Sequence, residues 1–176
     1  AVERLRRAGD EITVTGSSRT PITSDLAVWR GSVSVHRATL PEASAELARL
    51  AARVQGFIVQ RGFADSMVEI SSINSSAVRE RIGGEETNRI IGYRLFQTIS
   101  VTSRDIPRVT ALSREAGSLL AEGVPLSPEA PQYLFTGLGE MRIQMRGDAT
   151  EDARTRAKQI AERTGGRIGR IKSVRQ

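Results

Sequence analysis

Residues 33–41 read VSVHRATLP, and sixty-six positions later residues 99–107 read ISVTSRDIP. Each stretch opens on alternating apolar residues, the pattern of a strand with one buried face. Each then supplies a helix start, because a capping side chain (Thr39 or Asp105) is followed two residues later by a proline (Pro41 or Pro107). The two stretches therefore predict the same strand-to-helix connection at two places in the chain.

The residues around these connections extend the pattern on both sides. We expect strands over 25–37, 68–73, 91–101 and 133–135, helices from 40 to Gly62 and from 106 to Gly123, and a polar hairpin loop around Gly83-Gly84-Glu85-Glu86. This order predicts an α+β fold, with an antiparallel sheet built from a duplicated β-α-β unit of the ferredoxin-like kind. The pseudo-repeats span about 25–75 and 89–136. The alternative is that two unrelated turns share common capping chemistry.

Both ends of the chain depart from the repeat. After an N-terminal tail over 1–10, the β-branched run EITVTG at 11–16 predicts a first strand. Residues 138–163 predict a long helix with a stripe of small side chains, and 167–174 a final, very basic strand. We expect residues 11–176 to form a single domain, with 138–176 as its C-terminal helix and strand.

The composition limits the classes of site. The chain of 176 residues contains no cysteine, which excludes disulfides, thiolate metal sites and cysteine nucleophiles. Its 26 Lys and Arg against 20 Asp and Glu give a formal charge of +6, which suits either an anionic partner or a solvated, ion-paired surface. No apolar run reaches the roughly 18–20 residues of a membrane-spanning helix.

The titratable residues indicate no catalytic centre. His36 is the only histidine, and one histidine without cysteine cannot supply a zinc site. The pairs Glu85-Glu86 and Glu151-Asp152 are adjacent in sequence, and neighbours on a helix do not face one another. We therefore predict no catalytic residue, no metal site and no cofactor. An enzyme that closes residues 74–88 over the sheet as a lid is the remaining alternative.

A basic cluster near the C-terminus is the strongest candidate for binding a partner or an anion. Its members are Arg154, Lys158, Arg163, Arg167, Arg170 and Lys172. Nucleic acid, an anionic lipid face or an acidic protein are the partners it would suit. Interleaved acids at Glu151, Asp152 and Glu162 favour a solvated, ion-paired surface instead.

Four stretches together resemble the SIMPL-domain family of bacterial envelope proteins. They are ITVTG with Ser24-Asp25-Leu26-Ala27, the helix ending at Gly62 with the VEISS strand, Ile91-Gly92-Tyr93-Arg94 with TISVTSRDIP, and residues 152–162 with Thr164-Gly165-Gly166-Arg167-Ile168-Gly169. The order and spacing of these stretches, from Glu11 to Gln176, carry the resemblance.

The resemblance implies a non-enzymatic protein of the periplasm or outer membrane, with its signal peptide removed, that is linked to stress tolerance. It also implies self-association, so we expect a homo-oligomer that binds an envelope protein or an anionic surface. It supplies no catalytic residues to transfer. The alternative function is nucleic-acid binding through the C-terminal basic helix and strand, and export of the protein would argue against it.

Overall fold

The computed structural model describes residues 11–173 and divides the chain into two compact units. We call Ser24–Phe135 the sheet unit, and residues 1–23 together with 136–176 the helix unit. The elements are β1 (Leu26–Arg37), α1 (Leu40–Gln60), the 3-10 turn η1 (Asp65–Met67), β2 (Val68–Ile70), β3 (Asn74–Ile82), β4 (Glu85–Ser103), α2 (Ile106–Glu115), α3 (Ser118–Ala121), β5 (Leu126–Pro128), β6 (Gln132–Leu134) and α4 (Leu138–Arg163). The predicted α+β class is confirmed.

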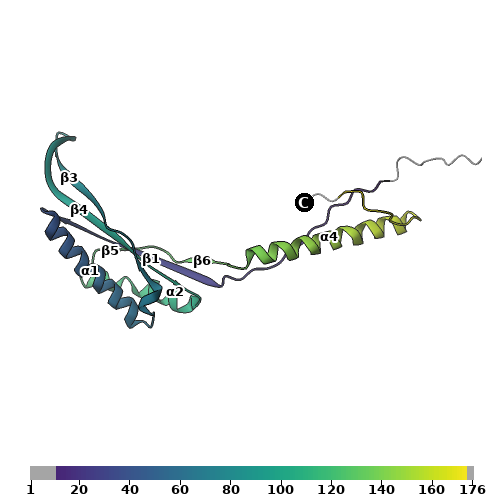
Figure 1. The fold of residues 1–176 in the computed structure, drawn as a ribbon, viewed down its shortest axis with the longest axis horizontal. Helices are drawn as coiled ribbons and strands as arrows, with labels where there is room; N and C mark the ends of the chain where they lie inside the picture. The colour runs from purple at the N-terminus through teal and green to yellow at the C-terminus, as the bar shows by residue number, and fades with distance from the viewer. Residues whose placement is uncertain (1–10, 174–176) are drawn as a thin grey trace, which may run out of the picture. The chain divides into compact units, whose positions relative to one another are not determined.

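The sheet unit is an antiparallel, six-stranded sheet with β1 and β4 side by side at its centre (Figure 1). On one side β2 and then β3 pair with β4, and on the other β5 and β6 pair with β1. The central ladder joins residues 27–37 of β1 to residues 93–103 of β4. The Ser32 and Thr98 hydroxyls, which face each other at its midpoint, are hydrogen-bonded at 3.1 Å.

The core of the sheet unit lies between one face of the sheet and helices α1 and α2 (Figure 1). The alternation along 25–37 predicted this, since Ala27, Trp29, Val33 and Val35 are all buried. Leu95, Ile99 and Val101 of β4 join them in one cluster with the apolar stripes of the two helices. Trp29 and Leu95 are both buried in this cluster.

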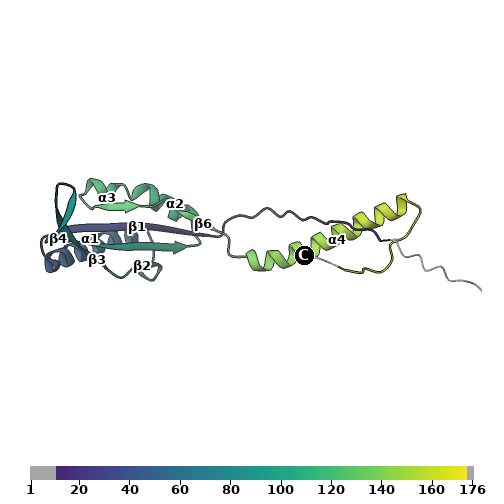
Figure 2. The same ribbon diagram turned by 90° about the horizontal axis from the view of Figure 1, so that it is seen from above.

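Both helix starts form as their sequences predict. The Thr39 hydroxyl accepts a hydrogen bond from the Glu42 N–H at 3.4 Å, and the Asp105 carboxylate accepts one from the Arg108 N–H at 3.1 Å. Each bond satisfies a backbone donor that has no partner within its helix. The predicted single helix up to Gly123 is wrong, however. It breaks after Glu115 into α2 and the short α3 (Figure 2), where Gly117 adds a residue of low helix propensity.

Replacing Asp105 with alanine is expected to lower the free energy of unfolding by about 1 kcal/mol, because the Arg108 N–H loses its acceptor. The Asp105→Asn variant keeps an acceptor and is expected to match the wild type to within a few tenths of a kcal/mol. Urea denaturation followed by far-UV circular dichroism measures both. Equal losses in the two variants would show that the cap contributes nothing.

The outer strands differ from the prediction in detail. The strand predicted over 68–73 ends at Ile70, because the Ser71 hydroxyl accepts the Thr98 N–H at 3.0 Å in place of a ladder carbonyl. The hairpin predicted around Gly83 and Gly84 is confirmed, and its strands are longer than expected, since β3 and β4 pair on either side of a two-residue turn at these glycines. Both glycines have positive φ angles, which suit such turns. The strand predicted at 133–135 is β6, and β5 was not predicted.

The helix unit contains α4, which spans Leu138–Arg163, the same residues that the sequence predicts, and passes through Gly147 without a break. The two strands predicted for the chain ends are wrong. Residues 11–16 form no strand, and Gly16 and Ser17 lie against α4 instead. Residues 167–173 form no strand either, and the rest of that prediction, from Val174, falls outside the described residues.

Candidate interaction surface

The N-terminal segment of the helix unit is held on α4 by contacts that require small residues. The Ser17 N–H donates to Asp152 Oδ2 at 2.9 Å, and Arg156 donates to the Ser17 hydroxyl at 3.3 Å. Gly16 lies so close to the helix that a Cβ atom built on it would be 1.8 Å from the Ala149 carbonyl oxygen. Ala149 and Ala153, which belong to the stripe of small residues on α4, therefore form the surface that this segment contacts.

The contacts with Ser17 and Arg156 lower the pKa of Asp152. The Ser17 N–H, and after it the guanidinium of Arg156, hold the pKa of Asp152 below its ordinary value of 3.8. Because the folded-state pKa is lowered, the stabilisation is fully present above 3.8 and disappears as the pH falls through the lower, folded-state value. Acid is thus expected to loosen residues 11–17 from α4.

This pH dependence is open to a direct measurement. We expect the amide resonance of Ser17 to shift on acidification in step with protonation of Asp152, and the Asp152→Asn variant to lose that shift. NMR titration of both proteins records it. A Ser17 resonance that moves identically in the variant would contradict the assignment of the hydrogen bond.

The six predicted binding residues all lie in the helix unit, and all six are exposed. Arg154, Lys158 and Arg163 are on α4, whereas Arg167, Arg170 and Lys172 follow it without regular structure. Lys158 pairs with Glu162 at 3.9 Å and Lys172 with Glu11 at 3.4 Å. Within residues 11–173 the four arginines of the set have no carboxylate partner.

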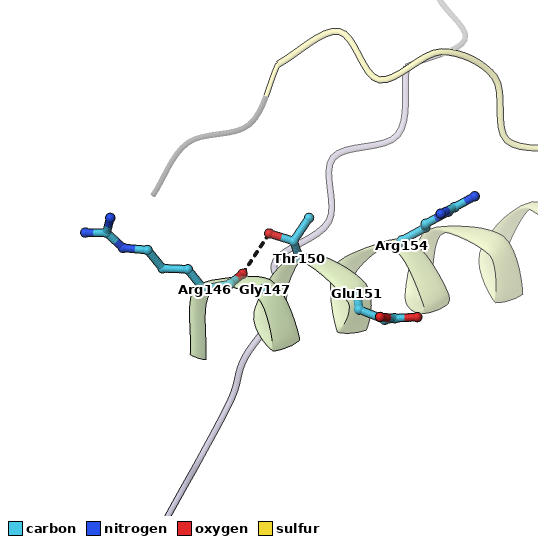
Figure 3. A pocket seen from close by; sticks show the side chains of 5 residues that line it. All are labelled: Arg146, Gly147, Thr150, Glu151 and Arg154. Atoms are coloured by element: carbon cyan, nitrogen blue, oxygen red, sulfur yellow. Dashed lines mark hydrogen bonds between the residues drawn. The ribbon is translucent and has the colours of Figure 1, made fainter. Parts of the chain in front are cut away.

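Sequence reasoning missed two members of this basic surface, Arg142 and Arg146. They lie on α4 four residues apart, at multiples of four residues from Arg154 and Lys158. Figure 3 shows Arg146 and Arg154 extending away from the helix on either side of Thr150, whose hydroxyl donates to the Arg146 carbonyl at 2.8 Å. These residues line a shallow, open hollow at Gly147. The four-residue spacing in the sequence was the available signal.

Two of the titratable residues considered as catalytic candidates, His36 and Glu86, lie in the sheet unit and not with the basic residues of α4. The exposed His36 lies at the end of β1, over Gly92, where an added Cβ would be 2.6 Å from its Nε2 atom. Glu86 lies in the β3–β4 hairpin and pairs with Arg81 at 2.9 Å. Among the described residues no group of three or more His, Asp or Glu side chains is placed to hold a metal ion. None of the helices there is long and apolar enough to cross a membrane.

The molecule is thus an α+β protein whose sheet unit contains a packed core and whose helix unit presents exposed basic side chains. Residues 12–176 match the family model described as "SIMPL: Protein of unknown function (DUF541)", and the chain belongs to this family. The resemblance seen in the sequence is therefore confirmed. No curated protein matches the chain.

Two solved structures have a partial likeness. They are hydantoinase/carbamoylase family amidases from Burkholderia ambifaria and Burkholderia multivorans, with 16% and 14% sequence identity and a TM-score of 0.28 each. The matches cover 65% and 62% of this chain but only 29% and 27% of those proteins. Likeness at this level carries no argument about activity.

Proposed function

We propose that this chain is a non-enzymatic protein of the bacterial cell envelope that acts by assembly, with copies of itself or with a partner protein. The envelope location and a link to stress tolerance rest on the family resemblance. Assembly has its own support in the helix unit, and the one observation that carries it is the distribution of buried apolar residues between the two units.

The sheet unit has a core, whereas the described part of the helix unit has none. Of the 23 buried apolar residues in the described part of the chain, 22 lie in the sheet unit and the other is Ala161 of α4. The helix unit also exposes large apolar side chains, namely Ile12, Ile22, Leu138, Ile143, Ile160, Ile168 and Ile171. Helices in proteins owe most of their stability to packing of an apolar face. A second molecule that covers these side chains would supply that packing.

Sedimentation velocity tests the proposal. The wild-type protein is expected to sediment faster as its concentration rises into the high micromolar range. The double variant Ile143→Glu, Ile171→Glu is expected to stay monomeric, because these side chains are 73% and 70% exposed in the helix unit. Charges buried in a contact without partners destabilise it strongly.

The matched control is the double variant Ile82→Glu, Leu120→Glu. Its residues are 66% and 50% exposed but belong to the sheet unit, so assembly is expected to persist. A wild-type protein that remains monomeric at all concentrations would count against self-assembly. Loss of assembly in the control alone would move the contact to the sheet unit.

We also propose that the sheet unit arose by duplication of a ferredoxin-like half. The paired stretches 27–37 and 93–103 are related by the same offset of sixty-six residues as the two repeated sequences. The pair at the midpoint of the ladder, Ser32 and Thr98, consists of two residues that are equivalent under this offset. The two helix caps also obey the offset, since Thr39 and Asp105 occupy equivalent places.

A further inference from the structure

The net charge of this protein is confined to one of its two units. The sheet unit contains twelve basic and twelve acidic side chains, which cancel, whereas the described part of the helix unit contains ten basic and six acidic ones. Such asymmetry is typical of chains that meet an anionic surface with one part. The division into units is needed to see it, because residues 1–23 and 136–176 lie at opposite ends of the sequence.

The two units also differ in how many of their basic side chains form ion pairs. Seven of the sheet unit's twelve arginines form ion pairs, for example Arg61 with Glu115 at 2.7 Å. In the described part of the helix unit only Arg156, Lys158 and Lys172 do so. The arginines left without a carboxylate partner within residues 11–173 of this unit include Arg142, Arg146, Arg154, Arg163, Arg167 and Arg170. Their guanidinium groups are available to anions from outside the chain.

The arrangement of these arginines on α4 suits a row of phosphates. Arg142, Arg146 and Arg154 are separated by multiples of four residues, and each step of four residues advances about 6 Å along the helix axis and about 40° around it. These three side chains therefore lie within an arc of about 120°, whereas Lys158 lies about 160° from Arg142. Guanidinium groups bind phosphate through paired, charge-assisted hydrogen bonds. A surface of closely spaced phosphate groups could therefore engage several of these arginines together.

The helix unit lacks what single-stranded nucleic acid recognition needs. All seven aromatic residues of the chain belong to the sheet unit, so the helix unit has no ring on which a base could stack. We propose that the helix unit binds the phosphate headgroups of an anionic phospholipid bilayer as a peripheral surface, through Arg142, Arg146 and Arg154. This inference rests on the proposed envelope role, and it names the surface that the protein meets there.

Vesicle co-sedimentation tests the inference on the full-length protein. Vesicles that contain phosphatidylglycerol are expected to bind it, vesicles of phosphatidylcholine alone are not, and added salt is expected to release it. Each basic residue near an anionic bilayer raises the partition coefficient about fivefold. The triple variant Arg142→Gln, Arg146→Gln, Arg154→Gln is therefore expected to bind about a hundredfold more weakly.

The control removes the same charge from the neutral unit. Arg94, Arg104 and Arg114 are exposed there and form no ion pair within residues 11–173, so their replacement with glutamine is expected to leave vesicle binding nearly unchanged. Equal losses in the two triple variants would overturn the inference, since net charge alone would then explain binding. It would also be overturned if the wild type bound no vesicles, or bound duplex DNA but no vesicles.

Circular dichroism on both triple variants checks that α4 is intact. A failure of vesicle binding can be distinguished from a failure of the proposed assembly, because sedimentation without vesicles reports on assembly alone. A protein that assembles but ignores anionic vesicles would retain the proposed function and lose only this inference.

Discussion

Replacing Trp29 with alanine is expected to lower the free energy of unfolding of the sheet unit by about 3–5 kcal/mol. Trp29 is fully buried at the centre of the core, opposite Val101 of β4. An added Cβ on Gly31 would be 2.9 Å from the Trp29 ring, so the space beside the ring is already filled. Truncation would leave a cavity that the surrounding β-strands could close only in part.

The Trp29→Phe variant separates the volume of this side chain from its polarity. Among the described residues the Trp29 N–H finds no hydrogen-bond acceptor, and an unpaired buried donor is costly. Phenylalanine keeps most of the ring and removes the donor, so we expect a loss below about 1.5 kcal/mol. Urea denaturation followed by far-UV circular dichroism is required, because Trp29 is the only tryptophan. Equal losses with alanine and phenylalanine would contradict the packing described here.

Replacing Gly16 with alanine is expected to detach residues 11–17 from α4. The new Cβ would lie 1.8 Å from the Ala149 carbonyl oxygen and 2.8 Å from the Ala153 nitrogen. Both atoms belong to the backbone of α4, so neither can move aside without distorting the helix. The hydrogen bond from Ser17 to Asp152 should be lost with the contact, and the pKa of Asp152 should return toward its ordinary value.

Gly147→Ala is the matched control for this change, since nothing lies within 4 Å of a Cβ built there. It is expected to stabilise α4, because glycine within a helix costs about 1 kcal/mol relative to alanine. Amide hydrogen exchange at Ser17 is expected to speed up by more than tenfold in Gly16→Ala and to stay unchanged in the control, a ratio that corresponds to more than about 1.4 kcal/mol of lost protection. Unchanged exchange in Gly16→Ala would show that this segment is not seated on α4.

The elements that the sequence predicts well are those whose signals are local. The boundaries of α4, the capping of α1 by Thr39 and the buried face of β1 depend on nearby residues, and all three are confirmed. The strand predicted at 11–16 failed because alternation describes side chains, whereas a strand also needs a neighbour for its backbone. Ser17, next to it, donates to Asp152 instead.

The candidate surface could be predicted only in part for the same reason. The basic residues at 154–172 stand out in the sequence, and the structure places them all in the helix unit. That the sheet unit is neutral follows only once the chain is divided in space, whereas the four-residue spacing of Arg142 and Arg146 is visible in the sequence and was overlooked. Charge pairing across long distances in sequence, as between Lys172 and Glu11, has no local signature.

Hydrogen–deuterium exchange compared at low and high protein concentration tests most directly whether the helix unit is the interacting part of the molecule. We expect exchange to slow with concentration in peptides from residues 138–163 and to stay constant across the core strands β1 and β4. Slower exchange confined to the sheet unit, or no dependence on concentration anywhere, would contradict this expectation.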